Sequence, residues 1–279
     1  MFSYIGGKYR IGKWIRDYIP SDIETYVEPF SGAFWVFFNM DLAKFPKLKR
    51  VVYNDFNPLN ANLFACIQDY KRFYEYIKDI PPQEKDRFEE YQKHAFSTTW
   101  VYNPLDPDYQ LGLEYIYVIT QVFSGSKPET SGFIDLKGNY NSKFESFRKR
   151  LGDPKRQKHF DKLDMVFNYD FNEVIDRFDS DTTYFYVDPP YYKCETYYSK
   201  HDFGKEDHER LSNTLKNIKG KFSLSYYDFP DLQTWYPKDQ FKWEVKSFKK
   251  AASAKLGVKQ NDGHELLIMN YDYPQTISV

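Results

Sequence analysis

Seven short runs of apolar residues recur along the chain and predict the strands of one sheet. Each run is rich in β-branched or aromatic residues and is bounded by polar or turn-forming residues, which is typical of strands. The predicted strands cover residues 25–30, 50–55, 165–169, 183–187, 221–227, 241–248 and 264–271. The last two runs lie close together in the sequence and predict a terminal antiparallel hairpin.

Stretches with apolar residues at helical spacing separate several of these runs. They predict helices over residues 8–18, 34–45, 58–78 and 205–218. Strands that alternate with helices favour a mostly parallel sheet that is covered on both faces. The pattern therefore predicts an α/β fold.

The alternation stops between residues 70 and 163. This stretch contains, in order, a charged helical pattern at 83–94, a loop rich in Pro and Asp at 103–108, a helix at 111–122 and a Gly/Ser/Asn-rich ribbon at 124–142. We interpret the stretch as a mainly helical domain with a β-hairpin. It would be inserted into a discontinuous core made of residues 1–69 and 164–279.

Composition narrows the class of protein. The chain has 279 residues, which suffices for one large domain or for a core with an insertion. Aromatic residues make up 20%, so most rings must be buried or half-buried, and one aromatic residue alone is weak evidence for ligand stacking. The charged fraction is 28% and the mean hydropathy is −0.73, and both predict a soluble chain.

Other features bear on compartment and cofactor. No run approaches the ~18 apolar residues of a membrane span, and no apolar segment near the N-terminus suggests secretion. Cys66 and Cys194 are the two cysteines, too few for a disulfide framework, and no Cys/His spacing indicates a metal site. We therefore expect a cytoplasmic monomer with neither a metal nor a membrane partner.

Charge is locally uneven although the net charge is only −1. Residues 143–162 hold eight Lys or Arg against three acids, and residues 242–259 hold six Lys against one. Such segments are candidates for contact with nucleic-acid phosphates, while a solvated charged helix face is the competing interpretation.

The tetrapeptide Asp188-Pro189-Pro190-Tyr191 directly follows the predicted strand at 183–187. In open α/β sheets, ligands bind just beyond the carboxyl ends of strands. Asp188 and a proline carbonyl can accept the N–H bonds of an exocyclic amine, while Tyr191 stacks on its ring. A Pro-rich turn without function is the competing interpretation.

A second group of candidates lies near the N-terminus. The segment from Glu28 to Phe34 joins an acidic strand end, a small-residue turn and a helix start, which suits a nucleoside-type cofactor, although a plain β–α turn looks the same. Asp55 ends the next strand and could bind a ribose hydroxyl or cap the following helix. Gly6-Gly7-Lys8 could hold a turn against a charged ligand or be a terminal turn, and its spacing differs from a P-loop.

The order of these motifs resembles the Dam-type, alpha-class DNA adenine-N6 methyltransferases of bacteria and phages. The resemblance covers nearly the whole chain and is most specific at Asp-Pro-Pro-Tyr and at Glu-Pro-Phe-x-Gly. It implies a Rossmann-like catalytic core that uses S-adenosylmethionine, and the cofactor-binding residues it implies are Tyr4, Gly6, Gly7, Lys8, Glu28, Pro29, Phe30, Gly32, Asp55, Asp170, Phe171 and Asp188. One departure is Phe34, which stands where the family has a second glycine; a ring there should narrow the cofactor pocket.

The same resemblance makes residues 70–163 a target-recognition domain for double-stranded DNA. Phe123 would enter the base stack beside an extruded adenine, and Ser124 would face the orphaned partner base. The implied DNA contacts are Phe123, Ser124, Asn139, Arg148, Arg150 and Arg156. Phe123 also ends an apolar helical pattern, so a core position is the competing interpretation.

The predicted reaction is transfer of a methyl group to the amino nitrogen of a flipped adenine at a specific site. Asp188, Pro189, Pro190 and Tyr191 form the predicted catalytic loop, with Asp188 orienting the amine rather than removing its proton. An RNA adenine or a cytosine substrate, a catalytically silent DNA-binding protein and a small-molecule methyltransferase are the alternatives. A restriction–modification role fits the family, but the recognition sequence cannot be predicted from residue types.

Overall fold

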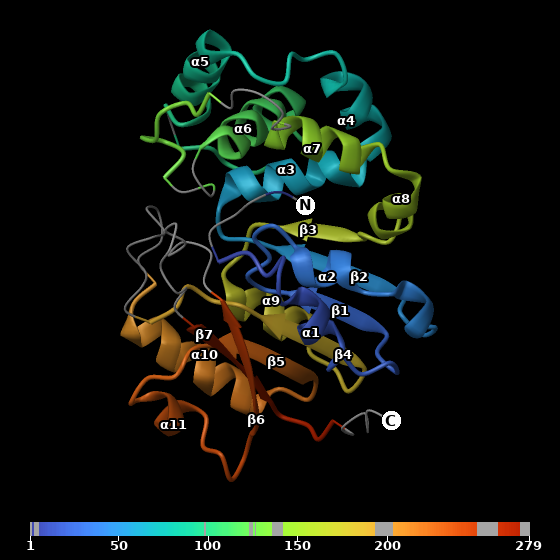
Figure 1. Cartoon of the computed structure of the whole chain (residues 1–279). Helices are drawn as coiled ribbons and strands as arrows, with labels where there is room; N and C mark the ends of the chain where they lie inside the picture. Colours follow the sequence, from blue (N-terminus) through green and yellow to red (C-terminus); the bar gives the residue numbers. More distant parts are fainter. Residues whose placement is uncertain are drawn as a thin grey trace.

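The computed structural model describes residues 2, 6–97, 99–122, 125, 127–135, 142–192, 203–249 and 262–273. Within these residues, seven strands form one sheet in the order β3-β2-β1-β4-β5-β7-β6 (Figure 1). The strands are β1 Thr25–Glu28, β2 Arg50–Asn54, β3 Met165–Phe167, β4 Thr183–Val187, β5 Lys221–Tyr226, β6 Lys242–Lys249 and β7 Asp262–Met269. β1 to β5 run parallel, and β7 is antiparallel to both β5 and β6. The predicted α/β fold and its terminal hairpin are confirmed.

The sheet separates two hydrophobic clusters, which explains the uninterrupted apolar run of β4. Along β4, Tyr184 and Tyr186 belong to the first cluster, and Phe185 and Val187 belong to the second. Both faces of β4 are therefore buried, as expected for a central parallel strand. Helices cover each face: α1 Gly12–Arg16, α2 Trp35–Asn39 and α3 Pro58–Gln68 carry first-cluster residues, while α9 Phe171–Phe178, α10 Lys205–Asn217 and α11 Leu232–Trp235 carry second-cluster residues.

The helices differ from the predicted ones mainly at their ends. The predicted helix at 58–78 is two helices, α3 and α4 Tyr70–Ile77, because Asp69 ends the first and caps the second. The predicted helix at 34–45 is α2 followed by the 3-10 turn η1 Leu42–Lys44. The helical pattern missed α7 Lys143–Leu151, α8 Pro154–Phe160, α9 and α11. Three of these carry a visible start signal, since the side chains of Ser142, Asp153 and Asp170 accept backbone N–H bonds.

The helices of residues 70–163 continue the core rather than standing apart from it. Figure 1 shows α4, α5 Lys85–Ala95, α6 Tyr109–Gln121 and α7 gathered around α3 beside the β3 edge of the sheet. Their buried residues belong to the first cluster together with those of α2 and α3. The predicted domain boundary at 69/70 falls in the turn between α3 and α4. Part of the predicted ribbon at 124–142 lies outside the described residues, and the part that is described contains no strand.

Polar contacts fix α6 onto α3. The Tyr115 hydroxyl donates to Asn60 Oδ1 over 2.8 Å in a fully buried bond. The Asn62 amide exchanges two bonds with the backbone of Asp108, at 2.8 and 2.9 Å. A Cβ atom at Gly112 would lie 2.9 Å from Cys66 Sγ, so this close helix crossing requires glycine. The inserted segment is thus rigidly attached to the core.

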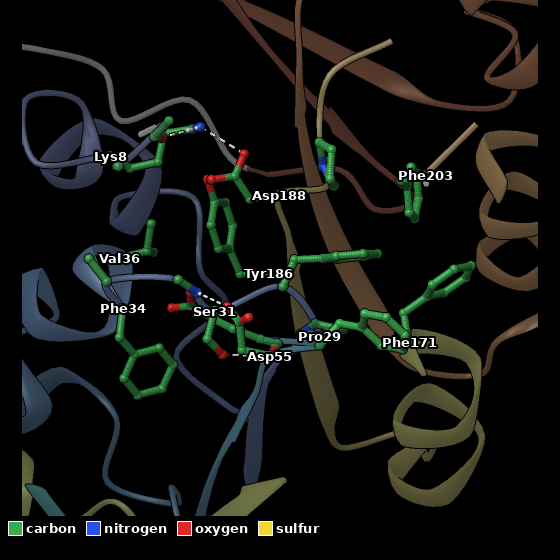
Figure 2. Close-up of a pocket in the computed structure, with 18 of the residues that line it drawn as sticks. Lys8, Pro29, Ser31, Phe34, Val36, Asp55, Phe171, Tyr186, Asp188 and Phe203 are labelled. Atoms are coloured by element: carbon green, nitrogen blue, oxygen red, sulfur yellow. Dashed lines mark hydrogen bonds and ion pairs between the residues drawn. The ribbon is translucent and has the colours of Figure 1, made fainter. Parts of the chain in front are cut away.

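Phe34 does not narrow a pocket, contrary to the expectation from the sequence. Its backbone is left-handed, with φ 58° and ψ 34°, which explains why a glycine suits this position. Its ring points away from the cavity and into the core, where it packs against Phe37, Tyr53 and Phe64 at centroid distances of 4.8, 5.2 and 5.8 Å (Figure 2). The packing of the buried Phe34 ring therefore offsets the strain of its left-handed backbone.

Replacing Phe34 by glycine should lower the free energy of unfolding by about 2–4 kcal/mol. Loss of a buried phenyl ring costs about 3–5 kcal/mol, and relief of left-handed strain returns about 1 kcal/mol. Urea unfolding measures the difference. The matched control is Lys127→Gly, which relieves a φ of 44° at an exposed position and should cause no loss. A Phe34→Gly protein as stable as the parent would contradict the packing role of the ring.

Candidate functional site

A cavity of about 260 Å³ opens where the carboxyl ends of β1, β2 and β4 meet. In the sheet, β2 lies on one side of β1 and β4 lies on the other, so the direction in which strands are added reverses here. Such a place is a topological switch point. The cavity unites most of the residues that the sequence predicted. Its predicted lining residues are Gly6, Gly7, Lys8, Glu28, Pro29, Phe30, Gly32, Asp55, Asp170, Phe171, Asp188 and Pro190.

The turn after β1 is held in place by the end of β2. The Ser31 hydroxyl donates to the Glu28 carbonyl over 2.7 Å and accepts from the Asn54 backbone over 3.0 Å. The Asn54 amide donates to the Pro29 carbonyl over 2.9 Å. Gly32 has a φ of 49°, which presents its backbone to the cavity without a side chain. The turn is thus preorganised for close approach by a ligand.

Asp55 joins this turn to the next helix. Its Oδ2 accepts from the Gly32 backbone over 2.8 Å, and its Oδ1 accepts from the Asn57 backbone over 2.9 Å. The N-cap of α3 is Asn57, whose side chain accepts from Leu59, so helix capping is not the role of Asp55. Asp55 also lines the cavity, and a carboxylate is a suitable acceptor for the hydroxyl groups of a ligand.

Glu28 is buried, and burial raises its pKa well above the usual range despite two opposing hydrogen bonds. Its Oε1 accepts from the Tyr26 hydroxyl over 2.6 Å and from the Phe37 backbone over 3.2 Å. These bonds connect the end of β1 to α2. Burial thus disfavours the charged form of Glu28 relative to an exposed glutamate.

Aromatic rings form one end of the cavity. Phe30, Phe171 and Phe203 contact one another at centroid distances of 5.3 to 5.8 Å. Figure 2 shows Phe171 and Phe203 at the right, Lys8 and Asp188 at the upper left and centre, and Asp55 below Asp188. The cavity therefore has an apolar end and a charged end.

Asp170 and Arg210 close the aromatic end. Two nitrogens of Arg210 donate to the two oxygens of Asp170, at 2.6 and 2.9 Å. Burial would raise the pKa of Asp170, but the bonds from Arg210 outweigh it and lower that pKa. The guanidinium lies 4.1 Å from the centroid of Phe171. This bidentate pair fixes the ring that lines the cavity.

The charged end is built on a buried ion pair. Lys8 Nζ lies 2.7 Å from Asp188 Oδ1 and donates to the Gly6 carbonyl over 2.9 Å. Burial raises the pKa of Asp188 to about 6, although the positive charge of Lys8 opposes this shift. A second carboxylate, Glu265 of β7, has its Oε1 3.5 Å from the same Lys8 nitrogen. One ammonium therefore serves two carboxylates.

Tyr191 is fixed beside this pair. Its ring stacks on Tyr226 at 5.5 Å and meets the edge of Tyr227 at 4.5 Å. Its hydroxyl donates to Glu265 Oε1, and Lys8 Nζ lies 4.9 Å from its ring centroid. Pro189 is buried, and Pro190 lines the cavity. All four residues of the predicted loop thus lie at or next to the charged end.

The residues predicted to contact DNA lie in different environments. Arg148 is only 17% exposed, and its guanidinium donates to the carbonyls of Lys78 and Ile80 and to Glu145. It therefore joins α7 to the preceding chain instead of facing solvent. Arg150 is half-buried over the Trp35 ring at 5.7 Å, and the charge of nearby Arg156, after burial, lowers its pKa. Tyr4, Phe123, Ser124 and Asn139 lie outside the described residues.

Several residues of the site were missed from the sequence, among them Phe203, Arg210 and Glu265. Phe203 and Arg210 belong to no motif and reach the cavity only because α10 packs beside α9. Glu265 did leave a signal, because its strand alternation puts it on the same face as Leu267 and Met269, which are buried in the first cluster. A charged residue at an inward strand position indicates a functional or paired carboxylate.

In the part of the chain that the structure covers, no helix combines the length and apolar character needed to cross a membrane. The described residues also contain no cluster of three or more His, Cys, Asp or Glu side chains arranged to hold a metal ion.

Comparison with known proteins identifies a family whose model this chain matches. Residues 4–251 match a family model described as D12 class N6 adenine-specific DNA methyltransferase. Over 96% of its length the chain is 26% identical to the Type II methyltransferase M.CviBI of Paramecium bursaria Chlorella virus NC1A, covering 98% of that protein. It is also 26% identical to the Type II methyltransferase M.MjaIII of Methanocaldococcus jannaschii, again with 96% and 98% coverage. With a DNA adenine methylase of Haemophilus influenzae, identity is 22% over 80% of this chain and 76% of that one.

Proposed function

This chain belongs to the D12 class N6 adenine-specific DNA methyltransferase family, and from this membership we propose which of its residues bind the methyl donor, the adenine and the DNA. The enzyme methylates the exocyclic amino group of adenine in DNA. The observation that carries the assignment is the single cavity that joins Gly32, Asp55 and Asp188. The one sequence feature that favoured a catalytically silent protein was Phe34, whose ring lies in the core. RNA is not the proposed substrate, because the family is described as specific for adenine in DNA.

The cavity fits S-adenosylmethionine. Phe30, Phe171 and Phe203 would contact its adenine, Asp55 would accept its ribose hydroxyls, and Gly32 would allow close backbone approach. Its amino-acid end would lie toward Gly6, Gly7 and Lys8. When bound, the cofactor supplies an electrophilic methyl group on a sulfonium. The acidic surroundings of Asp188 and Glu265 suit that positive charge.

Asp188 and the Pro189 carbonyl would accept the two amino hydrogens of the flipped adenine, and Tyr191 would contact its ring. These bonds orient the nitrogen lone pair toward the methyl group, which is catalysis by positioning. A new N–C bond forms as the C–S bond breaks, and the positive charge moves from sulfur to nitrogen. Asp188 stabilises this charge, and the extra proton leaves afterwards to water.

Flipping the adenine costs a few kcal/mol of lost pairing and stacking. Contact of its ring with an aromatic side chain returns ~1–3 kcal/mol. We keep Phe123 as the residue that fills the vacated stack, Ser124 as its neighbour at the orphaned base, and Asn139 as a contact in the DNA-reading segment. Because relatives are named Type II methyltransferases, we also infer that the enzyme modifies a defined short site beside a matching nuclease.

The DNA backbone would follow the surface around Tyr9, Arg150 and Arg156, with the buried Trp35 beneath it. Tyr9 is 60% exposed and meets the edge of Trp35 at 4.7 Å. Trp35 lines the cavity, and Arg150 covers its ring. This arrangement connects a basic, aromatic surface directly to the cavity. We leave Arg148 out of this surface because its donors are already engaged.

Asp188→Ala should abolish methylation, with the single-turnover rate reduced by roughly 10³-fold or more, because the amine loses its acceptor. The measurement uses radiolabelled S-adenosylmethionine and a DNA duplex. Calorimetry serves as the control: cofactor affinity should fall only modestly in Asp188→Ala and strongly in Asp55→Ala. Persistent turnover in Asp188→Ala would refute the proposed role of this residue.

The single-turnover rate should fall as pH drops through about 6, because the pKa of Asp188 is raised to about 6. Below that value Asp188 takes up a proton and stops accepting the amine hydrogens, so the rate should decrease about tenfold per pH unit. Circular dichroism at pH 5 checks that the protein stays folded. A rate that held constant down to pH 4.5 would place the ionisation elsewhere.

Arg150→Gln combined with Arg156→Gln should weaken DNA binding and lower the slope of log affinity against log salt by about two. Filter binding between 50 and 300 mM salt measures the slope. The control is Arg177→Gln on α9, an exposed arginine that packs on Phe167, and it should leave the slope unchanged. An unaltered slope in the double variant would remove these two residues from the DNA surface.

A further inference from the structure

We propose that Glu265 is a positioning residue that takes Lys8 from Asp188 and holds Tyr191 when the target adenine enters. The inference rests on the proposed roles of Asp188 and Tyr191. It assigns a part in the reaction to a residue of β7, outside the catalytic loop, that lies near the same lysine as that loop's carboxylate.

Glu265 occupies an unusual position for a charged residue. It is 5% exposed and lies in the middle of β7, directly opposite Lys246 of β6. Burial of an ionised carboxylate is costly unless charged or donor groups compensate it. The compensating groups are the Tyr191 hydroxyl, which donates to Oε1, and Lys8, whose Nζ lies 3.5 Å from the same oxygen.

Lys8 lies where it can exchange one carboxylate partner for another. Its ammonium is held by Asp188 Oδ1 at 2.7 Å and by the Gly6 carbonyl at 2.9 Å. Asp188 is also the proposed acceptor for the adenine amine, so Lys8 and the amine would compete for one carboxylate. Glu265 is a second carboxylate beside the ammonium, with its Oε1 3.5 Å from Nζ. A small displacement of Nζ toward Glu265 frees Asp188 while keeping the buried positive charge paired.

The same carboxylate also fixes Tyr191. Tyr226 and Tyr227 restrict the ring from two directions, and the hydroxyl bond to Glu265 sets its remaining orientation. A change at Glu265 is therefore felt by both parts of the loop: by Asp188 through Lys8, and by Tyr191 directly. This double contact distinguishes Glu265 from a carboxylate that only neutralises a buried lysine.

The charges around Asp188 give the proposal a specific readout. The titratable groups that face it are Lys8 of the N-terminal segment, Glu28 of β1, Tyr186 of β4, Tyr191 of the loop and Glu265 of β7. Lys8 opposes the rise in the pKa of Asp188, whereas the charge of Glu265 contributes to it after burial. Removal of the Glu265 charge should lower the pKa of Asp188, and a purely structural carboxylate would not have this effect on the reaction.

The test is the single-turnover rate of Glu265→Gln, measured against pH with saturating S-adenosylmethionine and duplex DNA. We expect a rate at pH 7.5 reduced roughly 10- to 100-fold, with cofactor affinity within about threefold of the parent. The acid side of the profile should move to lower pH by at least about half a unit. The matched control is Glu244→Gln on β6, which should keep the parent rate and profile.

Two further variants separate the contacts. Tyr191→Phe removes the hydroxyl contacts with Glu265 and with Asp188. It should slow the reaction without moving the acid side of the profile to lower pH, because the lost bond had lowered the pKa of Asp188. Glu265→Asp keeps the negative charge, but its side chain is too short to reach both Lys8 and Tyr191. Its single-turnover rate should therefore be lower, while its pH profile should match that of the parent. This variant tests the proposal if Glu265→Gln does not fold.

A parent rate in either Glu265 variant would overturn the proposal. So would a slow Glu265→Gln protein whose profile is unshifted, because that result would make Glu265 structural only. Failure of the proposed function itself is recognised separately, since Asp188→Ala would then retain turnover.

Discussion

The buried ion pair between Lys8 and Asp188 is the contact on which the site depends. Its partners are 180 residues apart in sequence, and they meet only because the N-terminal turn and the end of β4 reach the same edge of the sheet. In the proposed reaction the substrate amine would bind the same carboxylate as the lysine. The ion pair of the free enzyme and the proposed contact with the substrate would thus compete for Asp188.

The charged side chains of the cavity influence one another. Burial raises the pKa of Glu28 well above its usual range and that of Asp188 to about 6, the latter despite the adjacent ammonium. Asp188 and Glu265 share that one ammonium, so two acidic side chains surround Lys8 at this end of the cavity. A sulfonium donor would add positive charge at this end. Binding of the cofactor and ionisation of Asp188 should therefore favour each other.

Much of this was predictable from the sequence, and what was missed has clear physical causes. Strands such as β4 were recognisable because burial on both faces requires a continuous apolar run, and the cavity residues because motifs at strand ends converge in a parallel sheet. The direction of the Phe34 ring was not, since it depends on a left-handed backbone that only the structure reveals. Arg148 shows a second limit: composition marks a residue as basic, but not which carbonyls surround its guanidinium.

The attachment of the inserted helices explains how recognition and chemistry can act together. The segment from 70 to 163 shares its hydrophobic cluster with α2 and α3, and Tyr115 and Asp108 fix α6 to α3. α2 begins at Trp35, which lines the cavity and carries Arg150 of α7 on its ring. A rigid connection of this kind leaves little freedom for the segment to move alone, because a packed interior resists continuous deformation. The contacts with DNA that we propose for the segment would therefore bear directly on the wall of the cavity, and the fit of the bound site would reach Lys8 and Asp188 without a hinge.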